Sequence, residues 1–181
     1  KFEEAIELRR NTQALIDKAL DKDITTVLAK ETYVDWANDS LQKSASLKSQ
    51  VGRLLEAEID SRAGLSRTLK ARGKFSSQAG RHILRLQKII FEQGRFGDAE
   101  SLAREALKVL KVVGTEEDTK TLSDARAQVA DSLVAQAEWK DAVGYYDKIV
   151  RALQGDTITR RSVLGDNLNQ VWARYRTGGV K

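Results

Sequence analysis

Residues Ile83 to Leu107 read ILRLQKIIFEQGRFGDAESLAREAL, and this stretch decides the fold. Apolar residues recur in it every three or four positions, on both sides of a short break at Gln93 and Gly94. That spacing is typical of amphipathic helices, and Gly is the residue that most often follows the end of one. The stretch therefore predicts two helices joined by a tight turn.

The same arrangement returns further along the chain. The motif Gln93-Gly94-Arg95-Phe96 with Ala99 becomes Gln136-Ala137-Glu138-Trp139 with Ala142. The two copies lie 43 residues apart, and each stands between apolar stretches with helical spacing. A helix-turn-helix unit that repeats in this way is typical of an α-solenoid, in which hairpins stack on their neighbours.

The composition favours an all-α protein. The 181 residues include no Pro, and good helix formers such as Ala, Leu, Lys, Arg and Glu are abundant. Asp23 is a candidate N-cap for the second helix, and Ser76 or Ser77 for the fourth. The third helix is expected to bury the apolar face Val51, Leu54, Leu55, Ile59, Leu65 and Leu69. We expect helices over about 2–20, 24–43, 47–69, 77–93, 98–113, 119–135, 141–153 and 157–177.

The chain lacks several residue types on which catalytic and metal sites depend. The absence of Cys excludes disulfides, thiolate metal sites and a cysteine nucleophile within this segment. His82 is the only His, and we interpret it as a partly exposed structural residue because no catalytic signal clusters with it. No glycine-rich phosphate loop is present. We therefore predict no enzyme activity, no catalytic residue, no cofactor and no metal for this segment.

No apolar run approaches the length that spans a bilayer, and no signal peptide is visible. The chain begins at Lys1 without Met and ends just after Gly178-Gly179, as expected for a segment of a longer protein. We expect a soluble protein without a membrane span, and both the cytoplasm and the periplasm are compatible with the sequence.

The net charge of +5 is unevenly placed along the chain. Nine basic residues lie between Arg62 and Arg95, against Glu92 alone. Such blocks attract nucleic acid, anionic lipid or acidic protein surfaces. Charged faces are also common on the helices of soluble proteins. We favour this second interpretation, a solvated face whose acidic partner lies elsewhere in the longer protein.

The residues around the two turns resemble the tetratricopeptide repeat. The matching positions are Ile83, Leu86, Ile90, Gly94, Phe96, Ala99, Ala103, Ala106 and Leu107 in the first copy, and Arg126, Val129, Ala130, Leu133, Ala137, Trp139, Ala142, Tyr146 and Ile149 in the second. In that family these are mostly packing and turn positions, so the resemblance implies an α-α superhelix of antiparallel hairpins. Gln87 replaces a small residue, the closing Pro is absent, and the spacing exceeds the usual 34 or so residues, which resembles the long-repeat variant.

The resemblance also implies a division of the chain. We expect irregular or capping helices over 1–46, hairpins like the tetratricopeptide repeat over 47–155 and a capping helix over 156–181. The order of motifs from Arg62-Ala63-Gly64-Leu65 to Tyr145-Tyr146-Asp147 further resembles the repeat region that precedes the caspase-like CHAT peptidase domain in bacterial proteins. That family places its catalytic His and Cys in the downstream domain.

Three functions follow from this reading, in order of preference. The first is a scaffold that binds a protein or peptide on the concave face formed by the first helix of each hairpin. The outward polar positions on those helices are Arg81, Arg85, Lys88, Asp124, Gln128 and Asp131, and the basic set would suit an acidic peptide or a carboxylate terminus. The second is regulation of a fused CHAT-type peptidase. Nucleic-acid binding by the basic 62–95 segment ranks last, because the segment lacks interleaved aromatic residues for stacking.

Overall fold

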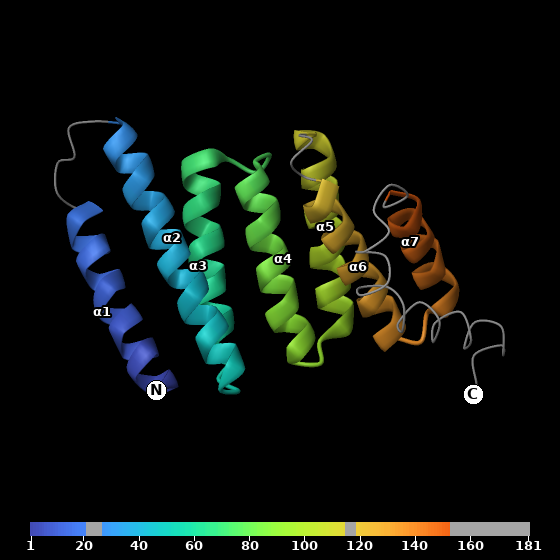
Figure 1. Ribbon diagram of the computed structural model, residues 1–181, viewed down its shortest axis with the longest axis horizontal. Coiled ribbons are helices and arrows are strands. Elements are labelled where there is room, and N and C mark those ends of the chain that lie inside the picture. Colours follow the sequence, from blue (N-terminus) through green and yellow to red (C-terminus); the bar gives the residue numbers. More distant parts are fainter. Residues whose placement is uncertain (21–26, 115–118, 153–181) are drawn as a thin grey trace.

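The protein is all-α, and its helices stand side by side in chain order (Figure 1). The computed structural model describes residues 1–20, 27–114 and 119–152. Their helices are α1 (Phe2–Leu20), α2 (Val27–Gln50), α3 (Leu54–Arg72), α4 (Ser77–Glu92), α5 (Phe96–Val113), α6 (Thr119–Ala135) and α7 (Trp139–Ala152). The expected N-cap at Asp23 and the expected last helix over 156–181 lie outside the described residues.

Each helix packs against the helices before and after it in the chain, and α4 also contacts α6. Short connections make consecutive helices antiparallel. The result is the expected α-α superhelix of antiparallel hairpins, in which α2–α3, α4–α5 and α6–α7 form three successive pairs. The N-cap expected at Ser76 is confirmed, because its side chain accepts a hydrogen bond from the backbone N–H of Ala79.

The three hairpins share one turn. Gly52, Gly94 and Ala137 each adopt a left-handed backbone, with φ of 78°, 79° and 64°. In every copy this residue donates its N–H to the carbonyl three residues back, and the next residue donates to the carbonyl five residues back. The longer bonds are Arg53 to Lys48 (2.8 Å), Arg95 to Ile90 (3.2 Å) and Glu138 to Leu133 (2.9 Å). This is the Schellman pattern that ends a helix on a left-handed residue.

The boundaries of the second and third helices differ from those expected from the sequence. A single helix, α2, runs through the expected break at Ser44 to Ser46 and ends at Gln50, so Gly52 is a turn residue and not a helix-interior one. Residue 46 accordingly lies inside α2. The sequence hid this turn because Leu54 stands where the other two copies have Phe96 and Trp139.

The buried face of α3 also differs from the expected one. Its buried residues are the small side chains Ala57, Ser61, Gly64 and Thr68. Leu55 and Ile59 are 73% and 66% exposed, and Leu69 is exposed as well. The shared turn explains the difference: Ala57 follows its left-handed residue at the same distance as Ala99 and Ala142, so the helix presents the same side to its neighbours. The turn fixes the rotation of α3, and the larger apolar residues then point outward.

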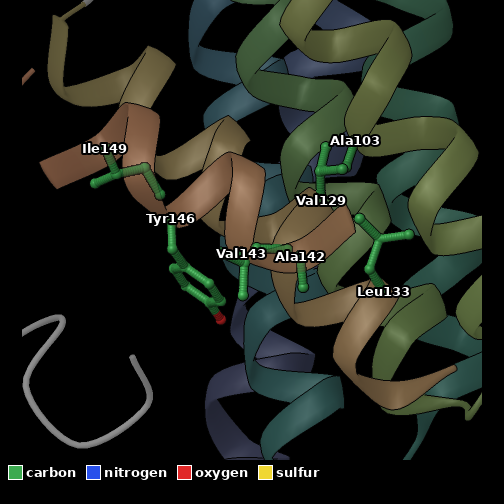
Figure 2. Close-up of a cluster of buried hydrophobic side chains, with 8 residues drawn as sticks. Ala103, Val129, Leu133, Ala142, Val143, Tyr146 and Ile149 are labelled. Atoms are coloured by element: carbon green, nitrogen blue, oxygen red, sulfur yellow. The ribbon is translucent and has the colours of Figure 1, made fainter. Parts of the chain in front are cut away.

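The second and third hairpins contain a continuous apolar core. One cluster joins α5, α6 and α7 and consists of Ala103, Val129, Ala130, Leu133, Ala142, Val143, Tyr146 and Ile149. Figure 2 shows the side chains of α7 in this cluster, which follow one side of the helix. A second cluster joins α4, α5 and α6 around Leu110. Most of the positions that match between the two copies thus lie in buried clusters, and Gly94 and Ala137 are turn residues.

The turn provides a first prediction. Ala137→Gly should raise the free energy of unfolding by about 0.5–1 kcal/mol, because a left-handed conformation costs an L-residue about 1–2 kcal/mol and the extra freedom of Gly in the unfolded chain offsets only part of this. Gly94→Ala should lower it by a similar amount, since a Cβ at Gly94 meets no atom within 4 Å and only the backbone is strained. Urea denaturation of both variants tests this. A destabilised Ala137→Gly variant would contradict a left-handed turn at that position.

Within residues 1–20, 27–114 and 119–152, no helix combines the length and the apolar composition needed to cross a membrane.

Candidate functional site

The six polar residues selected from the sequence occupy equivalent places on two helices. Arg81, Arg85 and Lys88 lie on α4, and Asp124, Gln128 and Asp131 lie on α6. Within each set the spacing of four and then three residues places the side chains on one face of the helix. The two faces belong to helices that contact each other directly.

Arg85 and Lys88 line a groove between α2 and α4, hereafter the α2–α4 groove. Its volume is about 430 Å³. Ala45 and Ile89 form an apolar floor, and both belong to a buried cluster with Ala57 of α3. The remaining lining residues are Asp39, Gln42, Lys43, Ser46, Ser49, Gln50 and Glu92. The groove thus combines a small apolar floor with polar and charged walls.

The charges in this groove are only partly compensated. Lys43 pairs with Asp39 at 2.6 Å, and the Glu92 carboxylate accepts a hydrogen bond from the Ser49 hydroxyl. Both acidic side chains therefore have partners on or across the groove. Among the described residues, the exposed side chains of Arg85 and Lys88 form no ion pair. The α4 wall is left with two cations that can bind a carboxylate from outside.

The α6 set is less available to a partner. The Asp131 carboxylate accepts a hydrogen bond of 2.6 Å from the Tyr146 hydroxyl of α7. Burial raises the pKa of Asp131, although the Tyr146 hydrogen bond opposes the shift. Partial desolvation raises the pKa of Asp124 and Lys120 opposes that shift, although Asp124 is exposed and thus open to a partner. None of the three α6 residues lines the α2–α4 groove.

The α2 half of the groove was missed at the sequence level. We found no repeat before residue 47, so the polar residues of α2 received no role. A detectable signal was the spacing from Gly52 to Gly94, which is 42 residues and nearly equals the spacing from Gly94 to Ala137. It places Asp39, Lys43 and Ser46 at the positions equivalent to Arg81, Arg85 and Lys88.

The basic 62–95 segment is largely compensated within the chain itself. At least five of its nine cations form ion pairs with described residues: Arg62 with Glu58, Arg67 with Asp17, Arg72 with Asp35, Lys74 with Glu105, and Arg95 with Glu58 and Asp98. The acidic partners that we expected elsewhere in a longer protein are present here for these five residues. They come from α1, α2, α3 and α5, so the segment is not one uniform basic face.

His82 is a structural residue, but it is buried and not partly exposed. Its side chain is 6% exposed. The Gln42 amide Nε2 lies 2.7 Å from His82 Nδ1, and an amide nitrogen can only donate, so the imidazole accepts at Nδ1 and is neutral. Burial, and then the charge of Arg85, lower its pKa to about 4.

This burial makes the stability depend on pH. The unfolded chain binds a proton on His82 below its ordinary pKa of 6.5, whereas the folded chain binds it only below about 4. Stability should therefore be full above pH 6.5 and fall as the pH drops from 6.5 to 4, by as much as about 3 kcal/mol. Urea denaturation of the protein and of His82→Gln across this range tests the assignment. A slope of the same size in His82→Gln would show that other groups cause it.

Within the described residues, no group of three or more His, Asp or Glu side chains is placed to hold a metal ion. The sequence matches no family model, and a search of curated proteins finds no matching relative. The function is therefore inferred from the geometry of the hairpins and of the α2–α4 groove.

Proposed function

We propose that this chain is a binding scaffold of the tetratricopeptide-repeat type, without catalytic activity of its own, and that it holds an acidic protein segment in the α2–α4 groove. The observation that carries this proposal is the pair of cations Arg85 and Lys88, which form no ion pair among the described residues, beside the apolar floor of Ala45 and Ile89. The first helices of two adjacent hairpins build the groove together.

The chemistry of the groove limits the partner. A carboxylate bound between Arg85 and Lys88 forms charge-assisted hydrogen bonds, which contribute about 1.5–3 kcal/mol each. The floor is small, so it accepts one modest apolar side chain beside that carboxylate. Polar side chains of α2, such as Ser46 and Gln50, offer hydrogen bonds to the backbone of an extended peptide. An acidic segment with an interspersed apolar residue fits these features.

The proposal is tested on an array of acidic, neutral and basic peptides. Arg85→Glu and Lys88→Glu should each weaken binding of the acidic peptides by about tenfold or more, the effect of losing one charge-assisted contact. Lys70→Glu is the matched control, because Lys70 is an exposed lysine of α3 that does not line the groove. Equal binding by the wild type and both groove variants would show that the acidic peptides do not bind in the α2–α4 groove.

A further inference from the structure

A second hollow lies between α5 and α7, and it is independent of the α2–α4 groove. Its volume is about 390 Å³. It is lined by Arg104, Leu107, Lys108, Lys111, Val112 and Tyr145, and we call it the α5–α7 hollow. Five of the six lining residues belong to α5 and the sixth, Tyr145, belongs to α7, so one helix sets most of the chemistry of this hollow.

Cations surround the single aromatic ring of this hollow. The Arg104 guanidinium carbon and the Lys148 Nζ lie 5.4 Å and 5.2 Å from the centre of the Tyr145 ring. Arg104 Nη1 also donates a hydrogen bond of 2.6 Å to the Tyr145 hydroxyl oxygen. These contacts fix the ring between α5 and α7, and they leave the hydroxyl hydrogen of Tyr145 available as a donor.

Two acidic side chains of α5, Glu100 and Glu105, already have partners. Glu100 accepts from Arg104 at 2.6 Å and from Gln136 at 2.8 Å, and Glu105 pairs with Lys74 at 2.6 Å. The negative charge of Asp141 also acts on Arg104, more weakly than that of Glu100. In the part of the chain that the structure describes, the exposed side chains of Lys108 and Lys111 form no ion pair. Among the described residues, the hollow therefore carries two lysines that form no ion pair, although the charge of Lys108 also acts on Glu105.

Apolar surface lies beside these cations. Val112 is 63% exposed, although it is a large apolar residue next to two lysines. Leu107 lines the hollow from the buried core of α5. Exposed apolar surface rimmed by charge is typical of protein interaction sites. A nucleic-acid surface for single strands would instead present several aromatic rings for successive bases, and this hollow has only one.

We propose that the α5–α7 hollow docks an acidic segment of a protein partner, in which Asp or Glu side chains flank an apolar one. The carboxylates bind Lys108 and Lys111, which are one helical turn apart on α5. The apolar side chain packs against Val112 and Leu107. The Tyr145 hydroxyl donates to a carboxylate or to a backbone carbonyl of the segment.

The test uses the full chain with Arg85→Glu and Lys88→Glu already in place, so that the α2–α4 groove cannot contribute. The probe is a short fluorescein-labelled peptide of Asp and Glu with two Leu residues, followed by fluorescence anisotropy. Adding Lys108→Glu and Lys111→Glu should weaken binding by about tenfold or more. Adding Lys18→Glu and Lys70→Glu, two exposed lysines outside both surfaces, is the matched control and should have a much smaller effect.

Several outcomes would overturn the proposal. They are no binding of the peptide to the starting variant, equal losses in the Lys108/Lys111 variant and in the control, or stronger binding of a single-stranded oligonucleotide of the same charge. Thermal unfolding followed by circular dichroism shows whether each variant is folded. Loss of the peptide-array signal in the α2–α4 groove leaves this result unaffected, so the two proposals fail separately.

Discussion

Ile90→Ala is expected to lower the free energy of unfolding by about 2–5 kcal/mol. Ile90 is 0% exposed and packs with Leu86 and Ala99, where α4 meets α5. Its truncation removes buried methylene groups and leaves a cavity, because the surrounding helices relax only partly. Urea denaturation followed by circular dichroism measures the change.

The matched control for this prediction is Ile59→Ala in α3. Ile59 is 66% exposed, so the same chemical change should alter stability by no more than about 0.5 kcal/mol. The comparison also tests the rotation of α3, because our sequence-based reading placed Ile59 in a buried face. Similar losses in the two variants would mean that the small residues Ala57, Ser61 and Gly64 do not form the buried side of α3.

The second large effect concerns an ion pair between α2 and α3. Lys48 Nζ lies 2.7 Å from Asp60 Oδ2, which also accepts a hydrogen bond of 2.6 Å from the Ser44 hydroxyl. Lys48 is buried at the position that Ile90 and Leu133 occupy in the other hairpins. Asp60→Ala should therefore cost up to about 3 kcal/mol, since the buried ammonium group then keeps only the longer ion pair with Glu56, at 3.9 Å, among the described residues.

Two further variants test whether the loss in Asp60→Ala comes from a charge that is both buried and deprived of its nearest partner. In Lys48→Met combined with Asp60→Leu, apolar packing replaces both charges, so the loss should be much smaller than in Asp60→Ala. Asp39→Ala breaks the exposed pair with Lys43 and should cost less than about 1 kcal/mol. An equal loss in Asp60→Ala and Asp39→Ala, measured by urea denaturation, would contradict a buried role for the Lys48–Asp60 pair.

The sequence predicted the second and third hairpins well because large apolar residues mark both of their packing faces. Leu86, Ile90 and Leu133 are all fully buried or nearly so, and the turn glycine Gly94 lies where expected. The first hairpin was missed because its interior uses small and polar residues. Ser61, Thr68 and Lys48 do not give an apolar period, although they occupy the same positions.

The candidate site was predicted only in part for the same reason. Arg85 and Lys88 were selected because they lie between packing residues of a recognised repeat. Their neighbours across the groove, such as Lys43 and Ser46, belong to the hairpin that was not recognised. The charge pairing of the basic segment was also inaccessible, since partners such as Arg67 and Asp17 are far apart in the sequence and meet only in the folded chain.

The most direct test of the α2–α4 groove is nuclear magnetic resonance of the ¹⁵N-labelled protein, titrated with the tightest-binding acidic peptide of the array. If the peptide binds in the α2–α4 groove, the amide signals that shift most should belong to residues 39–50 of α2 and 85–92 of α4. Arg85→Glu should abolish these shifts at the same peptide concentration. Shifts confined to other helices, or unchanged shifts in Arg85→Glu, would contradict the account.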